Sequence, residues 1–277
     1  MPRYESRYDP AMMPQNLEHV LYEKKEHVAY VTINRPEVRN ALHTYAYAEL
    51  RSCWLDIARD PDIYVGIVTG AGDAFCAGRD VKFLSEYQAK GIRTPHEDPT
   101  NPMYSWGGGG QPKDVQLEKP LISAINGYAV GVGLSIALQC QLRVMADDAW
   151  LGDLHTQVGR MGGAHRLYMA VPRAIAAELT LCNARLTAER CYQLGIVNAV
   201  VPKDQLIPAA EKLAERVCNA SPLAVQAAVR LYNLCSEFSP EMSALARHLD
   251  QETAETEDGA EGPRAFRERR KPQWKLR

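Results

Sequence analysis

The chain has 277 residues, of which 46% are hydrophobic and 24% are charged, so its composition is that of a folded globular protein and excludes a disordered one. Its formal net charge of -2 excludes the large excess of Lys and Arg that a general nucleic-acid binder needs. The N-terminus carries charge and proline, no apolar run reaches about 18 residues, and the cysteines are dispersed without a CxxC pair, so we expect a soluble cytoplasmic protein with no membrane partner.

The N-terminal two-thirds of the chain show an α/β pattern. Residues 1–17 are polar and contain prolines, and we expect them to form a loose arm. Short apolar runs typical of strands then alternate with the apolar spacing of helices. In chain order, the predicted elements are a hairpin over 19–23 and 27–34, a helix over 41–58, a strand over 64–69, a strand over 121–125, a helix over 133–140 and a strand over 141–146. Strands that alternate with helices imply crossover connections and a layered core.

The last third of the chain is predicted to be helical. Strand patterns nearly disappear after about residue 160, and only 197–201 reads as extended. The predicted helices cover 173–184, 187–194, 205–219, 222–237 and 239–256. Since no Pro/Ser-rich linker separates the two parts, we expect the helices to pack on the core. We divide the chain into an arm over 1–17, an α/β core over 18–203 and a helical region over 204–277.

One segment, residues 85–118, is irregular. It contains several prolines and the run Gly107 to Gly110. A long loop inside a compact domain is often a lid or a binding loop. A surface insertion is an equally good interpretation of the same residues.

Two glycine-rich turns follow predicted strands, over 70–80 and 126–133. Neither is a phosphate-binding loop, because GxxxxGK[ST] is absent and no GxGxxG opens a helix after a strand. Two such turns can instead present free backbone N–H groups at one point. If Gly133 begins a helix, the N–H groups around Val132 lie at its positive end, which favours a developing oxyanion. Tight packing of the turns is the alternative explanation.

The motifs around these turns resemble those of the enoyl-CoA hydratase/isomerase (crotonase) superfamily. Four segments are similar to the family's signatures and occur in the family's order, within a resemblance that spans residues 18–275. They are 31–42 (VTINRPEVRNAL), 66–82 (GIVTGAGDAFCAGRDVK), 119–133 (KPLISAINGYAVGVG) and 261–272 (EGPRAFRERRKP).

The resemblance implies a fold and a partner. The expected fold is a ClpP/crotonase-like spiral of ββα repeats with a C-terminal helical trimerisation region, and the expected assembly is a homotrimer or a dimer of trimers. Numerous apolar residues in the last third agree with such an assembly. The expected partner is an acyl-CoA substrate. We expect no metal and no cofactor other than the coenzyme A of the substrate.

The resemblance also assigns binding residues. The oxyanion hole would consist of the backbone N–H groups of Arg79 and Val132. Val132 stands where the family usually has Gly, which is tolerable only if its φ is negative. The residues implied to lie along the coenzyme A are Arg39, Ala41, Ala77, Val81 and Lys82. Ordinary solvated charges remain the alternative for Arg39 and Lys82, and Asp80 is expected to be a helix N-cap.

The acid/base positions depart from the hydratase pattern. Ser135 and His155 stand where hydratases of the family have two glutamates. Hydration needs a base for the water and an acid for the α-carbon, and Ser135 serves as neither at neutral pH. A small residue that packs a helix is its simpler interpretation. Histidine is a residue type that can serve as an acid or a base at neutral pH, and Asp153, two residues from His155 on a strand, would share its face and orient the imidazole.

These observations lead to a hypothesis with two rivals. The first reading is an acyl-CoA enzyme that stabilises a thioester enolate, with His155 as acid/base, and with isomerase or C–C bond hydrolase/lyase chemistry favoured over hydration. The rivals are a coenzyme A thioester-binding protein that has lost catalysis and a thioester hydrolase.

Overall fold

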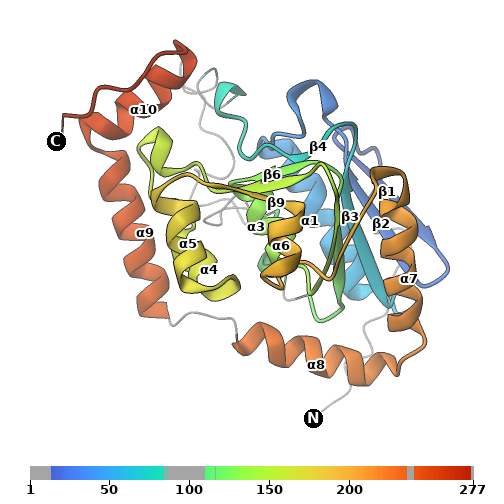
Figure 1. Ribbon diagram of the computed structural model, residues 1–277. Coiled ribbons are helices and arrows are strands. Elements are labelled where there is room, and N and C mark those ends of the chain that lie inside the picture. Colours follow the sequence, from blue (N-terminus) through green and yellow to red (C-terminus); the bar gives the residue numbers. More distant parts are fainter. Residues whose placement is uncertain (1–13, 84–85, 87–109, 116, 236–239, 276–277) are drawn as a thin grey trace.

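Two β-sheets and their covering helices form the core of the protein (Figure 1). The computed structural model describes residues 14–83, 86, 110–115, 117–235 and 240–275. The larger sheet has six strands, and in spatial order these are β1 (Val20–Lys25), β2 (Val28–Ile33), β3 (Val65–Gly70), β5 (Leu121–Ile125), β7 (Leu142–Ala146) and β10 (Ala199–Val201). Only the β1–β2 hairpin is antiparallel, and the remaining neighbours are parallel.

The central strands of this sheet are buried on both faces. Alternate side chains of β5 point in opposite directions: Leu121 and Ile125 join the main core, whereas Ile122 and Ala124 join a second cluster. Buried residues of α1 (Thr44–Arg59) and α3 (Val132–Gln139) also pack into the main core, and buried residues of α7 (Leu206–Cys218) pack into the second cluster. A parallel sheet covered on both faces explains why these strands read as continuous apolar runs.

A second sheet of four short strands lies beside the first. Its spatial order is β4 (Ala74–Cys76), β6 (Tyr128–Val130), β8 (Trp150–Gly152) and β9 (Arg185–Thr187). β4, β6 and β8 each follow a strand of the large sheet, namely β3, β5 and β7, and neighbour one another in the same order. The chain therefore forms a spiral, and each turn of the spiral contributes one strand to the large sheet and one strand to the small sheet. This is the expected spiral of ββα repeats.

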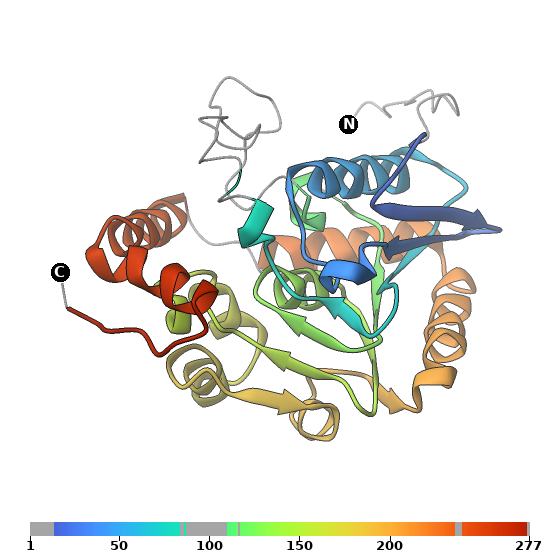
Figure 2. The ribbon, with the colours of Figure 1, turned by 90° about the horizontal axis from the view of Figure 1, so that it is seen from above.

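The remaining helices follow β8. They are α4 (Ala164–Ala170), α5 (Arg173–Leu181), α6 (Ala188–Gln193), α8 (Pro222–Cys235), α9 (Pro240–Ala254) and α10 (Glu257–Arg267). Short 3-10 helices connect several elements: η2 (Pro36–Val38), η3 (Pro112–Val115), η4 (Thr156–Val158) and η5 (Lys203–Gln205). α8 leads away from α7, and α9 and α10 lie on the far side of α4 and α5 from the sheets (Figures 1 and 2). In the described ranges no helix is long and apolar enough to cross a membrane.

The predicted strands of the large sheet and the five predicted C-terminal helices are present within a few residues. The helix predicted over 41–58 begins only at Thr44, because Arg39 and Asn40 have left-handed φ angles of 57° and 59° and His43 caps the helix through its side chain. The short strands β4, β6 and β9 and the helices α4 and α10 were not predicted. Most of the irregular segment 85–118 lies outside the described residues.

The apolar residues of the last third that we count toward an assembly face differ in exposure; they are Leu206, Ile207, Leu213, Val217, Leu223, Val225, Val229, Leu231 and Leu234. Leu206 and Val229 are buried within the chain, so they were wrongly assigned to a free surface. Large apolar side chains of α8 and α9 are exposed: Leu223, Leu231, Leu234, Met242, Leu245 and Leu249. The exposed set therefore lies on α8 and α9, whereas Leu206 at the start of α7 packs against the sheet.

Candidate active site

The first glycine-rich turn runs from β4 to the segment before Asp80. Gly78 has a φ of 101°, a conformation that favours glycine. Leu42 N–H donates to the carbonyl of Gly78 at 2.8 Å, and Asp80 N–H donates to the carbonyl of Leu42 at 2.9 Å. These two bonds form a parallel bridge between Leu42 and Arg79. In such a bridge the N–H of Arg79 points away from Leu42.

The second glycine-rich turn leads from β6 into α3. Gly131 has a φ of 56°, and its carbonyl accepts the first helical hydrogen bond, from Ser135 N–H at 3.0 Å. Val132 is the first residue of α3 and its φ is not positive, as the substitution of the family's usual glycine requires. The N–H groups of a helix's first turn have no acceptor within the helix. The N–H of Val132 is one of these groups.

The two turns lie against each other. A β-carbon built on Gly78 would lie 3.1 Å from the carbonyl oxygen of Val130 and 4.0 Å from the backbone nitrogen of Val132. A β-carbon on Gly133 would lie 2.3 Å from the carbonyl oxygen of Cys76, so this contact requires glycine. In the described part of the chain neither Arg79 N–H nor Val132 N–H has an acceptor. The turns therefore bring two available N–H groups into one region.

The imidazole of His155 lies at the same place. A β-carbon built on Gly131 would lie 3.4 Å from Cε1 and 3.6 Å from Nε2 of His155, and 4.0 Å from the α-carbon of Gly78. The Nε2 edge of the ring thus faces the turn that carries the N–H of Val132. The His155 side chain is one-third exposed, so water and ligands can reach it.

Asp153 contacts the other ring nitrogen. Its Oδ1 forms a short hydrogen bond with His155 Nδ1, and its Oδ2 accepts a hydrogen bond from Thr180 Oγ1 at 3.2 Å. The side chain of Asp153 is only 3% exposed. The expected pair is present, although neither residue belongs to a strand: Asp153 follows β8, and His155 begins η4 in a helical conformation. The dyad fixes the ring orientation and directs Nε2 outward.

Ser135 belongs to a neutral polar cluster. Its hydroxyl donates to Gln111 Oε1 at 2.8 Å, and the Nε2 of Gln139 donates to the same oxygen at 2.5 Å. Gln111 is buried, and it comes from the segment just before η3. Among the described residues, no carboxylate and no imidazole is hydrogen-bonded to the Ser135 hydroxyl. Ser135 is thus more than a small packing residue, yet nothing in its contacts makes it a base.

The residues implied to bind coenzyme A lie along the first turn. Ala77 N–H donates to the carbonyl of Arg39 at 3.0 Å, which ties the two signature segments together. Arg39, Val81 and Lys82 are exposed, and Lys82 lies 3.9 Å from the carboxylate of Glu86. Asp80 is an N-cap as expected, because its Oδ1 accepts a hydrogen bond from Phe83 N–H at 3.0 Å.

Arg35 holds the same turn from the side of β2. Its guanidinium donates to the carbonyl of Ala41 and to Asp80 Oδ2, the latter at 3.1 Å. Ala41 and Ala77 are each half-buried in this arrangement. Hydrogen bonds thus join Arg39 to Ala77, and Arg35 joins Ala41 to Asp80; we call Arg39, Ala41, Ala77, Val81 and Lys82 the binding edge.

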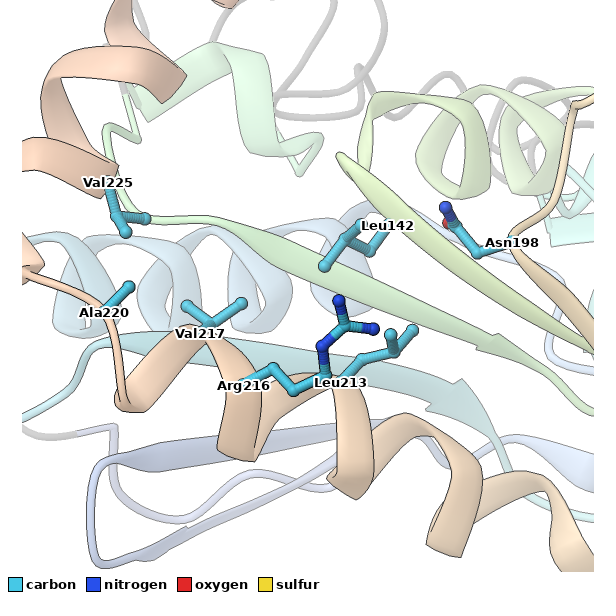
Figure 3. Close-up of a pocket in the computed structure, with 7 residues that line it drawn as sticks. All are labelled: Leu142, Asn198, Leu213, Arg216, Val217, Ala220 and Val225. Carbon is cyan, nitrogen blue, oxygen red and sulfur yellow. The ribbon is translucent and has the colours of Figure 1, made fainter.

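A separate hollow of about 500 Å³ lies between β7 and the α7–α8 region (Figure 3). Seven residues line it: Leu142, Asn198, Leu213, Arg216, Val217, Ala220 and Val225. It contains none of the residues of the two turns or the dyad. Its position on the outer side of the large sheet separates it from the candidate active site. In the described ranges, no group of three or more His, Cys, Asp or Glu side chains is arranged to hold a metal ion.

Comparison with models of known protein families identifies the family of this chain. The model described as enoyl-CoA hydratase/isomerase matches residues 23–277. The chain belongs to this family. Its fold is accordingly the crotonase fold, as the spiral of the two sheets indicates.

Similar proteins include two curated relatives and a solved structure. The (E)-benzylidenesuccinyl-CoA hydratase of Thauera aromatica is 38% identical over 261 residues, which are 91% of this chain and 97% of the relative. The carnitinyl-CoA dehydratase of Proteus mirabilis is 34% identical over 260 residues, 90% of this chain and 95% of the relative. The crystal structure of carnitinyl-CoA hydratase from Mycobacterium avium has a TM-score of 0.81 and 31% identity, and the match covers 94% of this chain and 99% of that one.

Sequence reasoning missed several residues around the site. Thr180 on α5 contacts Asp153, and Gln111 before η3 contacts Ser135, across long sequence separations. Gln139 on α3 contacts Ser135 from four positions away. Only Gln139 carried a local signal, since it lies one helical turn after Ser135.

Proposed function

We propose that this protein is an acyl-CoA enzyme in which the backbone N–H groups of Arg79 and Val132 hold a thioester oxygen and His155 transfers the proton. One observation supports this most directly: the Nε2 edge of His155 lies beside the turn that presents the Val132 N–H, with the Gly78 turn in contact. An oxyanion formed there and a proton carrier would thus be adjacent.

Backbone donors suit the first of these tasks. When a proton or a carbon group leaves the α-carbon of a thioester, negative charge moves onto the carbonyl oxygen. Two fixed N–H groups, one of them at the start of α3, stabilise that charge without reorganising. In other enzymes the loss of one such donor costs about 2.7–4 kcal/mol of transition-state stabilisation.

One imidazole suits reactions that need a single acid/base. In a double-bond isomerisation, Nε2 takes a proton from the α-carbon of a 3-enoyl thioester. The enolate forms, and Nε2 returns the proton to the γ-carbon. Asp153 balances the charge on the ring while the proton is held. No second carboxylate is needed at position 135, where the neutral Ser135 cluster stands.

The same groups suit cleavage of a C–C bond next to the thioester. Nε2 takes a proton from water, and the hydroxide oxygen bonds to the β-carbonyl carbon of a 3-oxoacyl thioester. The bond between the α- and β-carbons then breaks, and its electron pair becomes the thioester enolate. The imidazolium protonates the α-carbon, and the products are a carboxylic acid and a shorter acyl-CoA.

Hydration or dehydration is the second candidate, because the relatives named above are a hydratase and a dehydratase. With Ser135 and His155 at the glutamate positions, His155 would have to serve both proton transfers. It would take a proton from water and give it to the α-carbon on the same face. We rank this reaction below the single-base reactions for simple enoyl groups.

We also propose the binding edge and the assembly that the resemblance implies. The exposed Arg39 and Lys82 would meet the phosphates of coenzyme A, with Ala41, Ala77 and Val81 along the rest of the molecule. The exposed apolar residues of α8 and α9 would be covered in a homotrimer or a dimer of trimers.

A panel of thioesters tests the reaction. The purified protein is incubated with a 3-enoyl-CoA, a 3-oxoacyl-CoA and crotonyl-CoA, and products are identified by mass spectrometry. A saturated acyl-CoA in D₂O is included, since exchange of its α-hydrogens reports enolate formation whatever the later step. We expect isomerisation or cleavage, α-exchange, and little or no hydration of crotonyl-CoA.

The variant His155→Gln completes the test, because glutamine keeps a hydrogen-bonding group but does not titrate. Activity and α-exchange should fall by about 10²–10⁴-fold. Full activity of this variant would remove His155 from the proposal. Thioester binding without turnover in the wild type would favour a binding protein, and release of free coenzyme A would favour a thioester hydrolase. Rapid hydration of crotonyl-CoA would contradict the argument from the missing glutamates.

A further inference from the structure

The ring of His155 rests on the turn that follows it. A β-carbon built on Gly162 would overlap the imidazole, at 2.3 Å from Cγ and 2.4 Å from Nδ1 of His155. Gly162 has a φ of 61°, so glycine is favoured there for the backbone as well as for the contact. The backbone at Gly162 is thus in direct contact with the ring, and its position limits where the ring can lie.

A carboxylate of the C-terminal region holds this turn. Asp250, on α9, accepts a hydrogen bond from Gly162 N–H at 3.0 Å. It also forms an ion pair with Arg160, whose Nη2 lies 2.8 Å from Asp250 Oδ2. The Asp250 side chain is 13% exposed. Burial acts to raise the pKa of Asp250, but the hydrogen bonds from Arg160 and Gly162, together with the charges of Arg160 and His155, hold it below its usual value.

The helix after α9 packs on the first part of the same turn. A β-carbon on Gly159 would lie 2.6 Å from the carbonyl oxygen of Asp258, and one on Gly262 would lie 2.3 Å from the carbonyl oxygen of Val158. Backbone therefore meets backbone where α10 crosses η4. The segment from Val158 to Gly162 is held by α10 at its beginning and by Asp250 at its end.

We propose that Asp250 is a positioning residue for His155. Its carboxylate fixes Gly162 under the imidazole and adds a second negative charge near the ring, besides that of Asp153. Arg160 holds the carboxylate in place and offsets part of that charge. The proposal rests on the proposed role of His155 as acid/base, since a ring without a chemical role needs no precise position.

The structural alternative is that Asp250 only anchors α9 to the body of the protein. The two roles differ in what they change. An anchor affects the melting temperature and leaves the chemistry of the surviving folded enzyme intact. A positioning residue affects kcat more than KM, and it affects the pH at which the enzyme loses activity on acidification. The charged groups close to the ring in this comparison are Asp153, Asp250 and Arg160.

The test compares Asp250→Asn, Asp250→Ala and Arg160→Met with a matched control, Glu252→Gln, which removes an exposed carboxylate from the same helix. Each is assayed on the thioester that the wild type turns over. Asp250→Asn should lower kcat by about 10-fold with little change in KM, and Asp250→Ala by up to about 100-fold, because only asparagine keeps an acceptor for Gly162 N–H. Glu252→Gln should match the wild type.

The pH profile separates the roles further. Loss of the nearby negative charge in Asp250→Asn disfavours a protonated ring, so the acidic limb of kcat/KM should move to lower pH. Loss of the positive charge in Arg160→Met should move the same limb to higher pH. Arg160→Met keeps the carboxylate and its bond to Gly162, so it stays informative if the Asp250 variants do not fold.

The outcomes distinguish this proposal from the one on which it rests. If His155→Gln is fully active, the proposed acid/base role of His155 is wrong, and the positioning role of Asp250 is overturned with it. If His155→Gln is inactive while Asp250→Asn keeps the wild-type kcat and pH profile and loses only thermal stability, Asp250 is an anchor and the positioning role is overturned. Shifts of the acidic limb in opposite directions, together with a loss of kcat, would support it.

Discussion

The hydrogen bond between Asp153 and His155 permits a sharp prediction about the variant Asp153→Asn. The carboxylate accepts a hydrogen bond from Nδ1–H, so the neutral ring carries its proton on Nδ1 and leaves Nε2 free to take a proton from substrate. An asparagine amide can donate to Nδ1 instead, which places the ring proton on Nε2. The outward nitrogen then has no lone pair for catalysis. The side chains are nearly equal in size, so the fold should be kept.

The size of the effect follows from these contacts. If His155 is the single acid/base, its loss of function should lower kcat/KM by about 10²–10⁴-fold, which is about 3–5 kcal/mol of activation free energy. The Thr180 hydroxyl also bonds to Asp153, at 3.2 Å. Thr180→Val removes this hydrogen bond to the carboxylate and leaves the charge of Asp153, so it should cost about 1.5–3 kcal/mol of stability and less than about 10-fold in rate.

The assay is steady-state turnover of the thioester identified from the panel, with coenzyme A binding measured by calorimetry on the same preparations. Asp153→Asn should bind coenzyme A like the wild type, because the dyad lies apart from the proposed binding edge. Activity of Asp153→Asn within about threefold of the wild type would refute the reasoning, since a ring held in the wrong tautomer does not accept a proton at Nε2.

Three further predictions concern other parts of the molecule. Burial and the charge of Arg35 lower the pKa of His43 to about 4, so the unfolded chain binds more protons than the folded one below about pH 6.5. Stability should therefore fall by up to about 3 kcal/mol between pH 6.5 and 4, and chemical denaturation should show a weaker decrease for His43→Asn than for the exposed control His248→Asn. Arg39→Glu and Lys82→Glu should weaken coenzyme A binding in calorimetry without lowering the melting temperature, since each brings a negative charge to the phosphates; unchanged affinity in both would remove the binding edge. Sedimentation should show a trimer or hexamer, and a stable monomer at micromolar concentration would contradict the assembly.

Local sequence patterns predicted most of the large sheet because five of its six strands have five or six residues, enough to be recognised as apolar runs. The strands that were not predicted, β4, β6 and β9, have three residues each, too few for alternation to be recognised. They are strands because each lies beside its neighbour in the spiral, which is a long-range cause. α10 was missed for a different reason: Gly259, Gly262 and Pro263 are poor helix formers. The two glycines are present because α10 packs backbone to backbone on η4.

The candidate site shows the same division. The two glycine-rich turns and the Asp153–His155 spacing are local, so the sequence alone indicated them. The convergence of the turns at His155 depends on the spiral, which places Gly131 and Gly162 against the ring and Gly78 beside Gly131. Asp250 lies 88 positions from Gly162 in the sequence, and no local pattern connects the two.

The site separates two chemical tasks between backbone and side chains. Charge stabilisation depends on N–H groups whose directions are set by Gly78 and by the start of α3, so it tolerates a valine at position 132. In the proposed mechanism proton transfer depends on side-chain identity, and Ser135 and His155 stand at the two positions where the resemblance implies glutamates. Backbone N–H groups that bind a thioester oxygen stabilise the negative charge that develops on it. Several different reactions develop this same charge. In the proposed mechanism the reaction is therefore decided by where Nε2 of His155 can reach, which the hydrogen bond to Asp153 and the contact with Gly162 limit. This is why variants that move the ring without altering its chemistry are as informative about this enzyme as variants that remove it.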